Sequence, residues 1–149
     1  MGHSSATFEQ AKAGKEGGAA GVTHLFNAMS QIHHREPGLA GYALVEDKLY
    51  VEVIADMAHI HPEVLRLILR CKPPGRVLLV SDSLAGAKTD GVPENGPLYL
   101  PDGVTLAGSG ITLGDAVKNI ESLGVPHDTA VLFSSTNPRR FLEGAVKSI

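Results

Sequence analysis

Apolar runs and segments of helical spacing alternate along this chain. Three runs that are rich in apolar and β-branched residues predict buried strands within residues 19–26, 48–56 and 76–82. Segments that are rich in helix formers or carry apolar residues at helical spacing predict helices within residues 7–17, 61–71, 111–124 and 126–144. Buried strands that alternate with helices indicate a parallel sheet with helices packed outside it.

The remaining segments carry turn signals. Residues 27–38 are polar and predict a loop, while residues 38–47 are ambiguous and are compatible with a short helix. Residues 85–103 are loop-like and are expected to end in a small hairpin. Asn137 and Pro138 are expected to interrupt the last helical stretch, because proline lacks the backbone N–H that a helix interior uses.

This order of elements predicts an α/β fold that forms the second half of a (β/α)8 barrel. A whole barrel of this kind needs about 250 residues, and the chain has 149. The alternative is an open Rossmann-like sheet. No GxGxxG loop stands at a strand–helix junction, which weakens that alternative.

Composition narrows the classes of function. Hydrophobic residues make up 43% of the chain and charged residues 19%, with a net charge of -3. The longest basic run is Arg139–Arg140, so nothing indicates binding to nucleic acid. No apolar run approaches the length of a membrane span, which is about 18 residues. The single cysteine, Cys71, excludes a disulfide within the chain and fits a reducing cytoplasm.

Four polar residues stand where apolar segments give way to turns: His3, His24, His59 and Asp82. Because the strand ends of a barrel open onto one face, these residues are expected to meet in one pocket. His3 has no predicted strand before it in this chain. Imidazoles suit Zn²⁺ and Fe²⁺, so His3 and His24 are candidate metal ligands, although a surface histidine and an ordinary strand-end histidine would look the same.

Asp82 follows five residues of a buried strand. A carboxylate in this position is costly unless it is paired, hydrogen-bonded or functional. Beside a bound metal it could take a proton from a water molecule and pass it to a leaving group. The structural alternative is an ordinary turn or helix-capping aspartate.

The remaining candidate binding residues are a cationic loop, an asparagine and a segment of small residues. His33, His34 and Arg35 could bind a phosphate together with His59, or form a solvated loop in which Glu36 neutralises the charge. Asn27 could hydrogen-bond a sugar or amide group. The small residues within 106–109 would let backbone N–H groups approach a ligand, although a plain loop explains them as well.

Several segments carry a resemblance when they are taken in order. They are GHSSAT, VTHLFNAM, HHREPGLAG, ADMAH, LLVSDS, TLAGSGITLGDAV and SSTNPRRFL. Together they strongly resemble the second half of the N-acetylglucosamine-6-phosphate deacetylase family, which belongs to the amidohydrolase superfamily. The resemblance covers nearly the whole chain.

The resemblance implies a barrel enzyme that removes acetate from the 2-acetamido group of an amino-sugar phosphate. It implies a divalent metal, Zn or Fe, held in part by His3 and His24, with Asp82 as the catalytic acid and base. The positions that match the family's substrate contacts are Asn27, Ala28, Asp56, Met57, Ala58, His59, Leu106, Ala107 and Gly108. Arg35 and His59 resemble the phosphate-binding pair. In the family the arginine reaches the site of the neighbouring subunit, which implies a homodimer.

The chain also departs from the family pattern. The family's first barrel half, with an acidic metal ligand, and its small β-sandwich domain have no counterpart in residues 1–149, so we expect a single partial barrel domain. Met57 stands where the family has a small glycine and is expected to crowd the sugar site. An active piece of a deacetylase is therefore one hypothesis, and a non-catalytic sugar-phosphate-binding or oligomeric fragment is the other.

Overall fold

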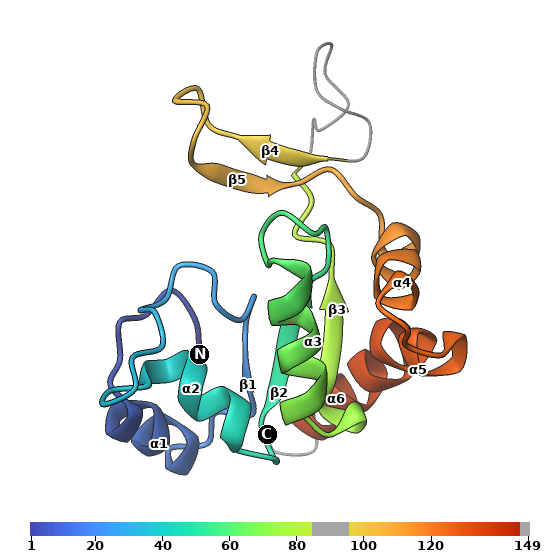
Figure 1. Ribbon diagram of the computed structural model, residues 1–149. Coiled ribbons are helices and arrows are strands. Elements are labelled where there is room, and N and C mark those ends of the chain that lie inside the picture. The colour runs from blue at the N-terminus through green and yellow to red at the C-terminus, as the bar shows by residue number, and fades with distance from the viewer. Residues whose placement is uncertain (85–95, 147–149) are drawn as a thin grey trace.

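A three-stranded parallel sheet forms the centre of the molecule. The computed structural model describes residues 1–84 and 96–146. The strands are β1 (Gly21–Val22), β2 (Tyr50–Ile54) and β3 (Val77–Val80), in the order β1-β2-β3. Both pairs are parallel, with Val51 beside Val22 and Val77. All three strands therefore end at the same edge of the sheet (Figure 1).

Helices connect the parallel strands and continue beyond them. They are α1 (Phe8–Glu16), α2 (Gly38–Val45), α3 (Pro62–Cys71), α4 (Leu113–Ser122), α5 (His127–Val131) and α6 (Asn137–Val146). A short 3-10 turn, η1 (Pro74–Arg76), precedes β3. The ambiguous segment 38–47 thus contains a helix, and its residues from Gly38 to Leu44 are all buried. This uniform burial explains why no amphipathic pattern marked it.

Local capping explains where the amphipathic helices begin. The Thr7 hydroxyl accepts a hydrogen bond from the Gln10 N–H, and the Gln10 side chain accepts one from the Thr7 N–H. At α3, the His61 ring caps the Glu63 N–H and Pro62 occupies the first turn. Both arrangements satisfy backbone donors that a helix N-terminus leaves free. The helices predicted within 7–17 and 61–71 are therefore confirmed.

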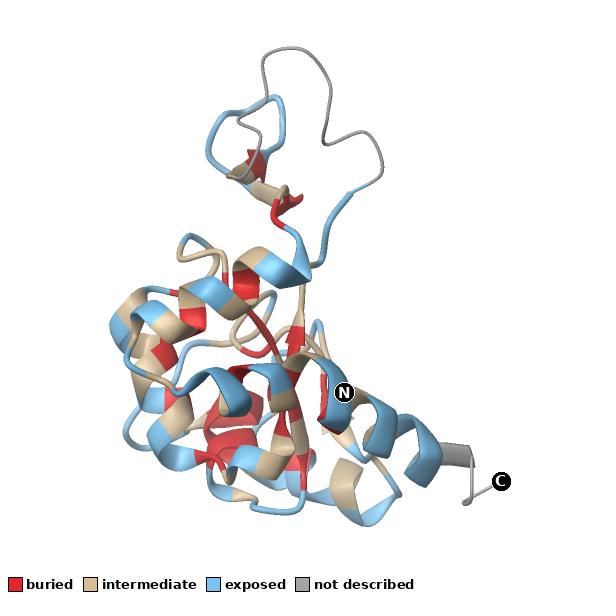
Figure 2. Cartoon of the chain, turned by 90° about the vertical axis from the view of Figure 1, so that its right-hand side faces the viewer, coloured by how far each residue is buried: buried red, intermediate tan, exposed pale blue. Residues whose placement is uncertain are grey.

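The core lies between the sheet and its helices. Val51, Val53, Val77 and Leu79 alternate along β2 and β3 and belong to this core. Figure 2 shows buried residues along the strands and the inner faces of the helices. One buried cation joins the core, because Lys72 donates through Nζ to the carbonyl oxygens that end α2, and its burial lowers its pKa. These bonds satisfy carbonyls that the helix end leaves free.

Met1 lies beside β1 as a neighbouring strand would. Its ammonium group donates to the Gly21 carbonyl at 2.7 Å, and its carbonyl accepts from the Thr23 N–H at 2.8 Å. This pairing brings His3 to the same sheet edge as the ends of β1, β2 and β3. The pairing of Met1 with β1 therefore gives His3 the strand-end position that the sequence predicts for it.

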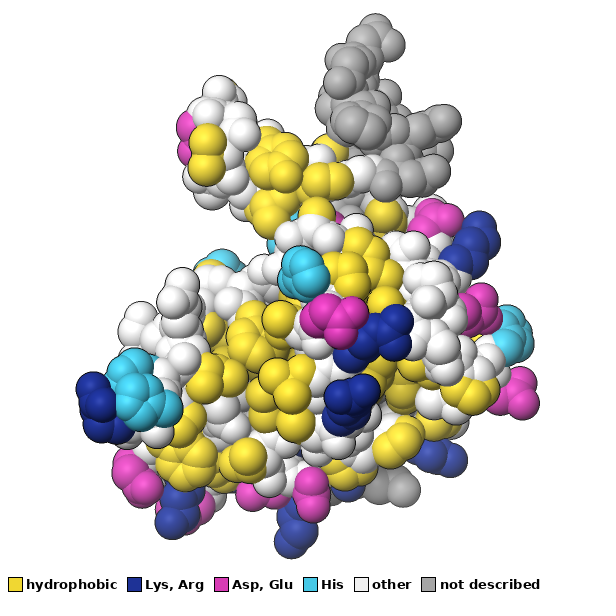
Figure 3. Space-filling view, viewed as in Figure 1, with side chains coloured by type: hydrophobic (Ala, Val, Ile, Leu, Met, Phe, Trp, Pro, Cys, Tyr) yellow, Lys and Arg dark blue, Asp and Glu magenta, His cyan; other side chains and the backbone are white. Residues whose placement is uncertain are grey.

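An antiparallel hairpin of β4 (Pro97–Tyr99) and β5 (Leu106–Ser109) lies beyond the carboxyl ends of the strands (Figure 1). Tyr99, Leu100 and Val104 are exposed on it, and Figure 3 shows hydrophobic side chains on this part of the surface. The expected hairpin exists, but it extends past residue 103, because the small residues 106–109 form its second strand. Residues 85–95 of the predicted loop lie outside the described part.

The helical stretch after residue 126 contains an irregular turn before Asn137, whereas the sequence predicts an interruption at Asn137 and Pro138. A wide π-helical turn, η2 (Leu132–Thr136), joins α5 to α6, so the stretch is not broken at Asn137 and Pro138. The Asn137 N–H bonds to the Leu132 carbonyl, five residues earlier. Pro138 has no N–H to donate, and the preceding turn widens instead of breaking. No helix in the described residues has the length and apolar character needed to cross a membrane.

Candidate active site

The carboxyl ends of the strands surround a cavity of about 200 Å³. Its lining residues come from the N-terminal segment, the turns after β1, β2 and β3, and strand β5. They are His3, His24, Asn27, Ala28, His59, Asp82, Leu106, Ala107 and Gly108. The structure therefore brings together the four strand-end residues that the sequence singled out, along with five of the positions implied by the resemblance.

Several pocket residues have a left-handed backbone. The φ angles of His3, His24, Ala28 and Asp82 are 45°, 25°, 51° and 48°. A non-glycine residue in this region costs about 1–3 kcal/mol, and such residues cluster at functional sites. This shared strain at four lining residues from three separate turns makes the pocket the candidate functional site of the described residues.

His3 and His24 are the candidate metal ligands, and their rings adjoin. Their centroids are 4.6 Å apart in an edge-to-face arrangement. The Nδ1 atom of His24 is buried and has no hydrogen-bond partner, as expected of a nitrogen that awaits a ligand. Among the described residues, however, no group of three or more histidine, cysteine, aspartate or glutamate side chains could hold a metal. The imidazoles fit a divalent ion in kind, but two fall short of the three protein ligands of a catalytic zinc site.

Asp82 follows β3 and is fastened by the hairpin. Its carbonyl accepts a hydrogen bond from the buried Ser109 N–H at 3.1 Å. A Cβ atom placed on Gly108 would lie 2.9 Å from this same carbonyl, so β5 approaches the turn too closely for a side chain. The hairpin thus helps to place the Asp82 carboxylate at the cavity.

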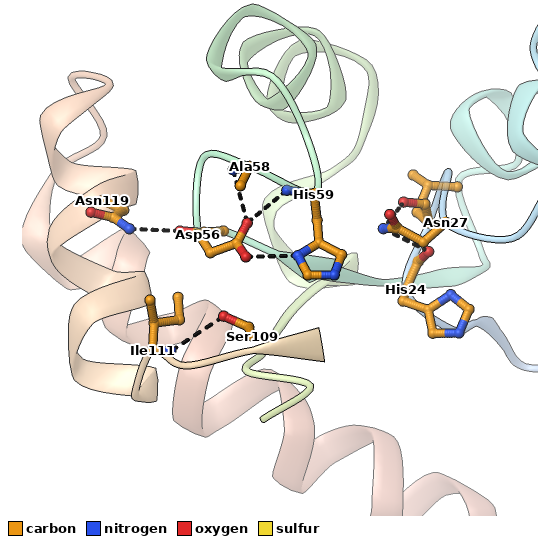
Figure 4. A network of polar contacts seen from close by, with 10 residues as sticks. His24, Asn27, Asp56, Ala58, His59, Ser109, Ile111 and Asn119 are labelled. Carbon is orange, nitrogen blue, oxygen red and sulfur yellow. Dashed lines mark hydrogen bonds and ion pairs between the residues drawn. The ribbon is translucent and has the colours of Figure 1, made fainter. Parts of the chain in front are cut away.

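The turn after β2 is organised by Asp56. Its buried carboxylate accepts from the Ala58 N–H at 3.0 Å and the His59 N–H at 2.8 Å, and it contacts His59 Nδ1 at 2.7 Å (Figure 4). Burial acts to raise the pKa of Asp56, but these hydrogen bonds outweigh it and hold the pKa below its ordinary value. Of the residues 56–59 implied as substrate contacts, His59 lines the cavity, while Asp56, Met57 and Ala58 do not.

Asn27 holds its own turn. Its Nδ2 group donates to the carbonyls of His24 and Leu25, each at 3.3 Å. These bonds stabilise the strained turn that carries His24 into the cavity (Figure 4). The amide therefore has a structural task in addition to the substrate contact that the resemblance implies.

Arg35 lies outside the cavity of its own chain. Its Nη1 atom is 2.7 Å from His34 Nε2, and both side chains are on an exposed loop. Among the described residues Glu36 forms no ion pair with this cluster, and its Oε1 atom instead accepts from the N–H groups of Phe8 and Gly38. The structure thus brings His59 but not Arg35 to the pocket, and a role for Arg35 in a neighbouring subunit stays a prediction.

Two supporting residues escaped the sequence reasoning. Ser109 belongs to the small-residue segment 106–109 that is predicted to bring backbone N–H groups to a ligand, but its N–H donates to the Asp82 carbonyl instead. Asn119 donates through Nδ2 to the Ala55 carbonyl at 2.8 Å and ties α4 to the end of β2 (Figure 4). A signal for Asn119 existed, because it lies on α4 beside the buried Ala116 and Ile120, where a polar side chain needs a partner.

Comparisons with known proteins extend this picture, although no family model matches the chain. The chain is 35% identical to the N-acetylgalactosamine-6-phosphate deacetylase of Escherichia coli O157:H7, over 95% of its length and 40% of the relative's. It is 38% identical to the N-acetylglucosamine-6-phosphate deacetylase of Vibrio furnissii, over 95% of its length and 38% of the relative's. The chain thus spans about two fifths of the length of these relatives.

A shorter relative matches over most of both chains. The putative N-acetylgalactosamine-6-phosphate deacetylase of Escherichia coli K12 is 33% identical over 80% of this chain and 77% of its own length.

Solved structures give the same result. The N-acetylglucosamine-6-phosphate deacetylase of Thermotoga maritima superimposes with a TM-score of 0.84 at 34% identity, covering 95% of this chain and 42% of that one. A variant of the Mycobacterium smegmatis enzyme in complex with N-acetyl-D-glucosamine 6-phosphate gives 0.84 at 33% identity, covering 95% and 41%. The resemblance read from the motifs is confirmed, and the chain belongs to the family of N-acetylglucosamine-6-phosphate and N-acetylgalactosamine-6-phosphate deacetylases.

Proposed function

We propose that this chain forms part of the catalytic barrel of a hydrolase that removes the N-acetyl group from an N-acetylhexosamine 6-phosphate. The observation that carries the proposal is the convergence of His3, His24, His59 and Asp82 in one cavity. The fold fits the second half of a (β/α)8 barrel, because its three parallel strands deliver these residues to one edge.

Asp82 is the residue that moves the proton. Its carboxylate takes a proton from the attacking water as the water oxygen bonds to the amide carbon. It then gives that proton to the sugar nitrogen as the carbon–nitrogen bond breaks. The products are acetic acid and the amine of the hexosamine phosphate, and the acid's proton then passes to the amine to give acetate and an ammonium group. One water molecule is consumed and the carboxylate is regenerated.

His3 and His24 are the residues that would hold a divalent metal, Zn²⁺ or Fe²⁺. When bound, the metal would supply Lewis-acid polarisation of the amide carbonyl. The free Nδ1 atom of His24 and the adjoining ring of His3 support this assignment. A complete site needs at least one further donor, since the described residues gather no third ligand.

The phosphate is bound by His59 and by Arg35 of a second copy. His59 lines the cavity, and the exposure of the Arg35 side chain on the loop between β1 and α2 supports a contact with a second copy. Guanidinium and imidazole groups are suited to phosphate oxygens. We therefore propose a homodimer that acts on an amino-sugar phosphate in the cytoplasm.

The proposal is tested by acetate release from N-acetylglucosamine 6-phosphate and N-acetylgalactosamine 6-phosphate, with added Zn²⁺ or Fe²⁺. We expect turnover that disappears in the Asp82→Asn variant, because an amide cannot accept the water proton. Circular dichroism of both proteins verifies that they are folded. A folded chain that binds glucosamine 6-phosphate and releases no acetate would make this stretch a binding fragment instead.

A further inference from the structure

We propose that Asp56 is a positioning residue that fixes the ring of His59, so that Nε2 is the nitrogen presented to the cavity and, when protonated, donates to the substrate phosphate. This inference rests on the proposed function for the identity of the anion. Its first part, the fixed ring, rests only on the geometry of the turn after β2.

The contact between the two side chains is closed off from solvent. The side chain of Asp56 is 0% exposed and that of His59 is 6% exposed, with 2.7 Å between Oδ2 and Nδ1. An ionised carboxylate can only accept hydrogen bonds, so Nδ1 must carry the proton of this contact. The low pKa of Asp56 agrees with an ionised group at neutral pH.

The second oxygen of Asp56 fixes the backbone of the same turn. Oδ1 accepts from the N–H groups of Ala58 and His59, so three hydrogen bonds converge on one carboxylate. Asn119 anchors the residue before it through the Ala55 carbonyl. The ring of His59 is therefore held at both its backbone and its Nδ1 atom, which leaves little freedom to rotate.

The free side of the ring faces the candidate site. In Figure 4, the edge of His59 opposite Asp56 points toward the side where His24 and Asn27 lie, and all three residues line one cavity. The ionisable groups that share this cavity with His59 are His3, His24 and Asp82. A proton on Nε2 would make His59 an imidazolium whose charge Asp56 balances, which is a suitable donor for a phosphate oxygen.

The variant Asp56→Asn separates positioning from folding. The amide oxygen can still accept the two backbone N–H groups, so the turn is retained. The amide nitrogen is a donor, however, and it faces Nδ1, so the ring must give up its proton there and carry its neutral proton on Nε2. Two-bond nitrogen–proton NMR spectra of the histidine rings distinguish the two tautomers directly.

We expect the Nδ1–H tautomer of His59 in the unaltered chain at alkaline pH and the Nε2–H tautomer in Asp56→Asn. The matched control is Asn119→Ala, which loosens the same turn without touching the pair and should leave the tautomer unchanged. The same tautomer in the unaltered chain and Asp56→Asn, or a tautomer change in the control, would overturn the inference.

Binding supplies the second readout. We expect the affinity for glucosamine 6-phosphate to fall about tenfold in Asp56→Asn, since Nε2 then donates from a neutral imidazole and its hydrogen bond to the phosphate is no longer charge-assisted. The affinity for glucosamine, which lacks the phosphate, should not change. Equal losses for both ligands would overturn the assignment of Nε2 to the phosphate. If the unaltered chain binds neither ligand, the proposed function and that assignment fail, while the NMR spectra still decide whether Asp56 fixes the ring.

Discussion

Single residues in strained conformations carry the site, and Met57 gives a direct measure of the cost. Met57 has a φ of 65° in the turn after β2, and its side chain packs against the core. Met57→Ala and Met57→Gly remove similar packing, but only glycine adopts this backbone without strain. We expect the glycine variant to exceed the alanine variant in free energy of unfolding by about 1 kcal/mol. Urea denaturation of the pair measures the difference, and equal stabilities would show that the turn stores no strain.

The residues of the cavity were largely predictable because of where they stand. His24, His59 and Asp82 each follow an apolar run, and the carboxyl ends of parallel strands share one edge, so their meeting follows from local pattern. The pairing of Asp56 with His59 was not predictable, because an aspartate three residues before a histidine fits a substrate contact as well as an internal hydrogen bond. The left-handed φ angles of the four lining residues leave no compositional trace either.

Among the secondary-structure elements, α4 illustrates how a predicted cap controls stability. The Thr112 hydroxyl accepts from the Asp115 N–H, and the Asp115 carboxylate accepts from the Thr112 N–H and hydroxyl. We expect Thr112→Ala to lower the free energy of unfolding by about 1 kcal/mol. The Thr112 hydrogen bonds lower the pKa of Asp115 below 3.8, so its contribution is present above that pH and is lost as the pH falls through the lower folded value. The difference between the two proteins should therefore shrink as the pH falls from 7 to 2 without vanishing, because the Thr112 hydroxyl still caps the Asp115 N–H at acid pH.

The hairpin depends on a close approach that only glycine permits. We expect Gly108→Ala to push β5 away from Asp82, because the new Cβ would lie 2.9 Å from both the Asp82 carbonyl oxygen and Leu84 Cγ. Acetate release should fall while the melting temperature changes little, since the core of the sheet and helices is not touched. The control is Gly75→Ala in η1, where nothing lies within 4 Å of the added atom and the backbone is not left-handed. Equal activity of both variants would show that the position of β5 does not affect the Asp82 carboxylate.

At the scale of the whole molecule, Asn137 joins the C-terminal helices to the sheet. Its Nδ2 group donates to the carbonyls of Pro74 and Val77, each at 2.8 Å, across about sixty residues of sequence. Asn137→Ala leaves both carbonyls without this partner in a buried place, so we expect a loss of about 2–3 kcal/mol in the free energy of unfolding. Asn137→Asp should be worse, because an ionised carboxylate would face the two carbonyl oxygens. Thermal unfolding ranks the three proteins, and an unaltered melting temperature in Asn137→Ala would show that α6 docks without this link.

The proposed metal site also depends on the proposed homodimer. One chain offers His3 and His24 in one cavity, and the described residues supply no group of three ligands. Structural zinc sites with four ligands reach about 10–16 kcal/mol of binding free energy, so two imidazoles should give roughly half of that, a Kd of about 1 μM to 0.1 mM. Calorimetry with Zn²⁺ should show this weak binding in the unaltered chain and in His34→Ala, whose imidazole lies outside the cavity, and none in His24→Ala. Nanomolar affinity would contradict a two-ligand site.

Sedimentation at the same concentrations would then show whether a second copy of the chain supplies the third ligand. If it does, metal binding favours the dimer, and both should increase together.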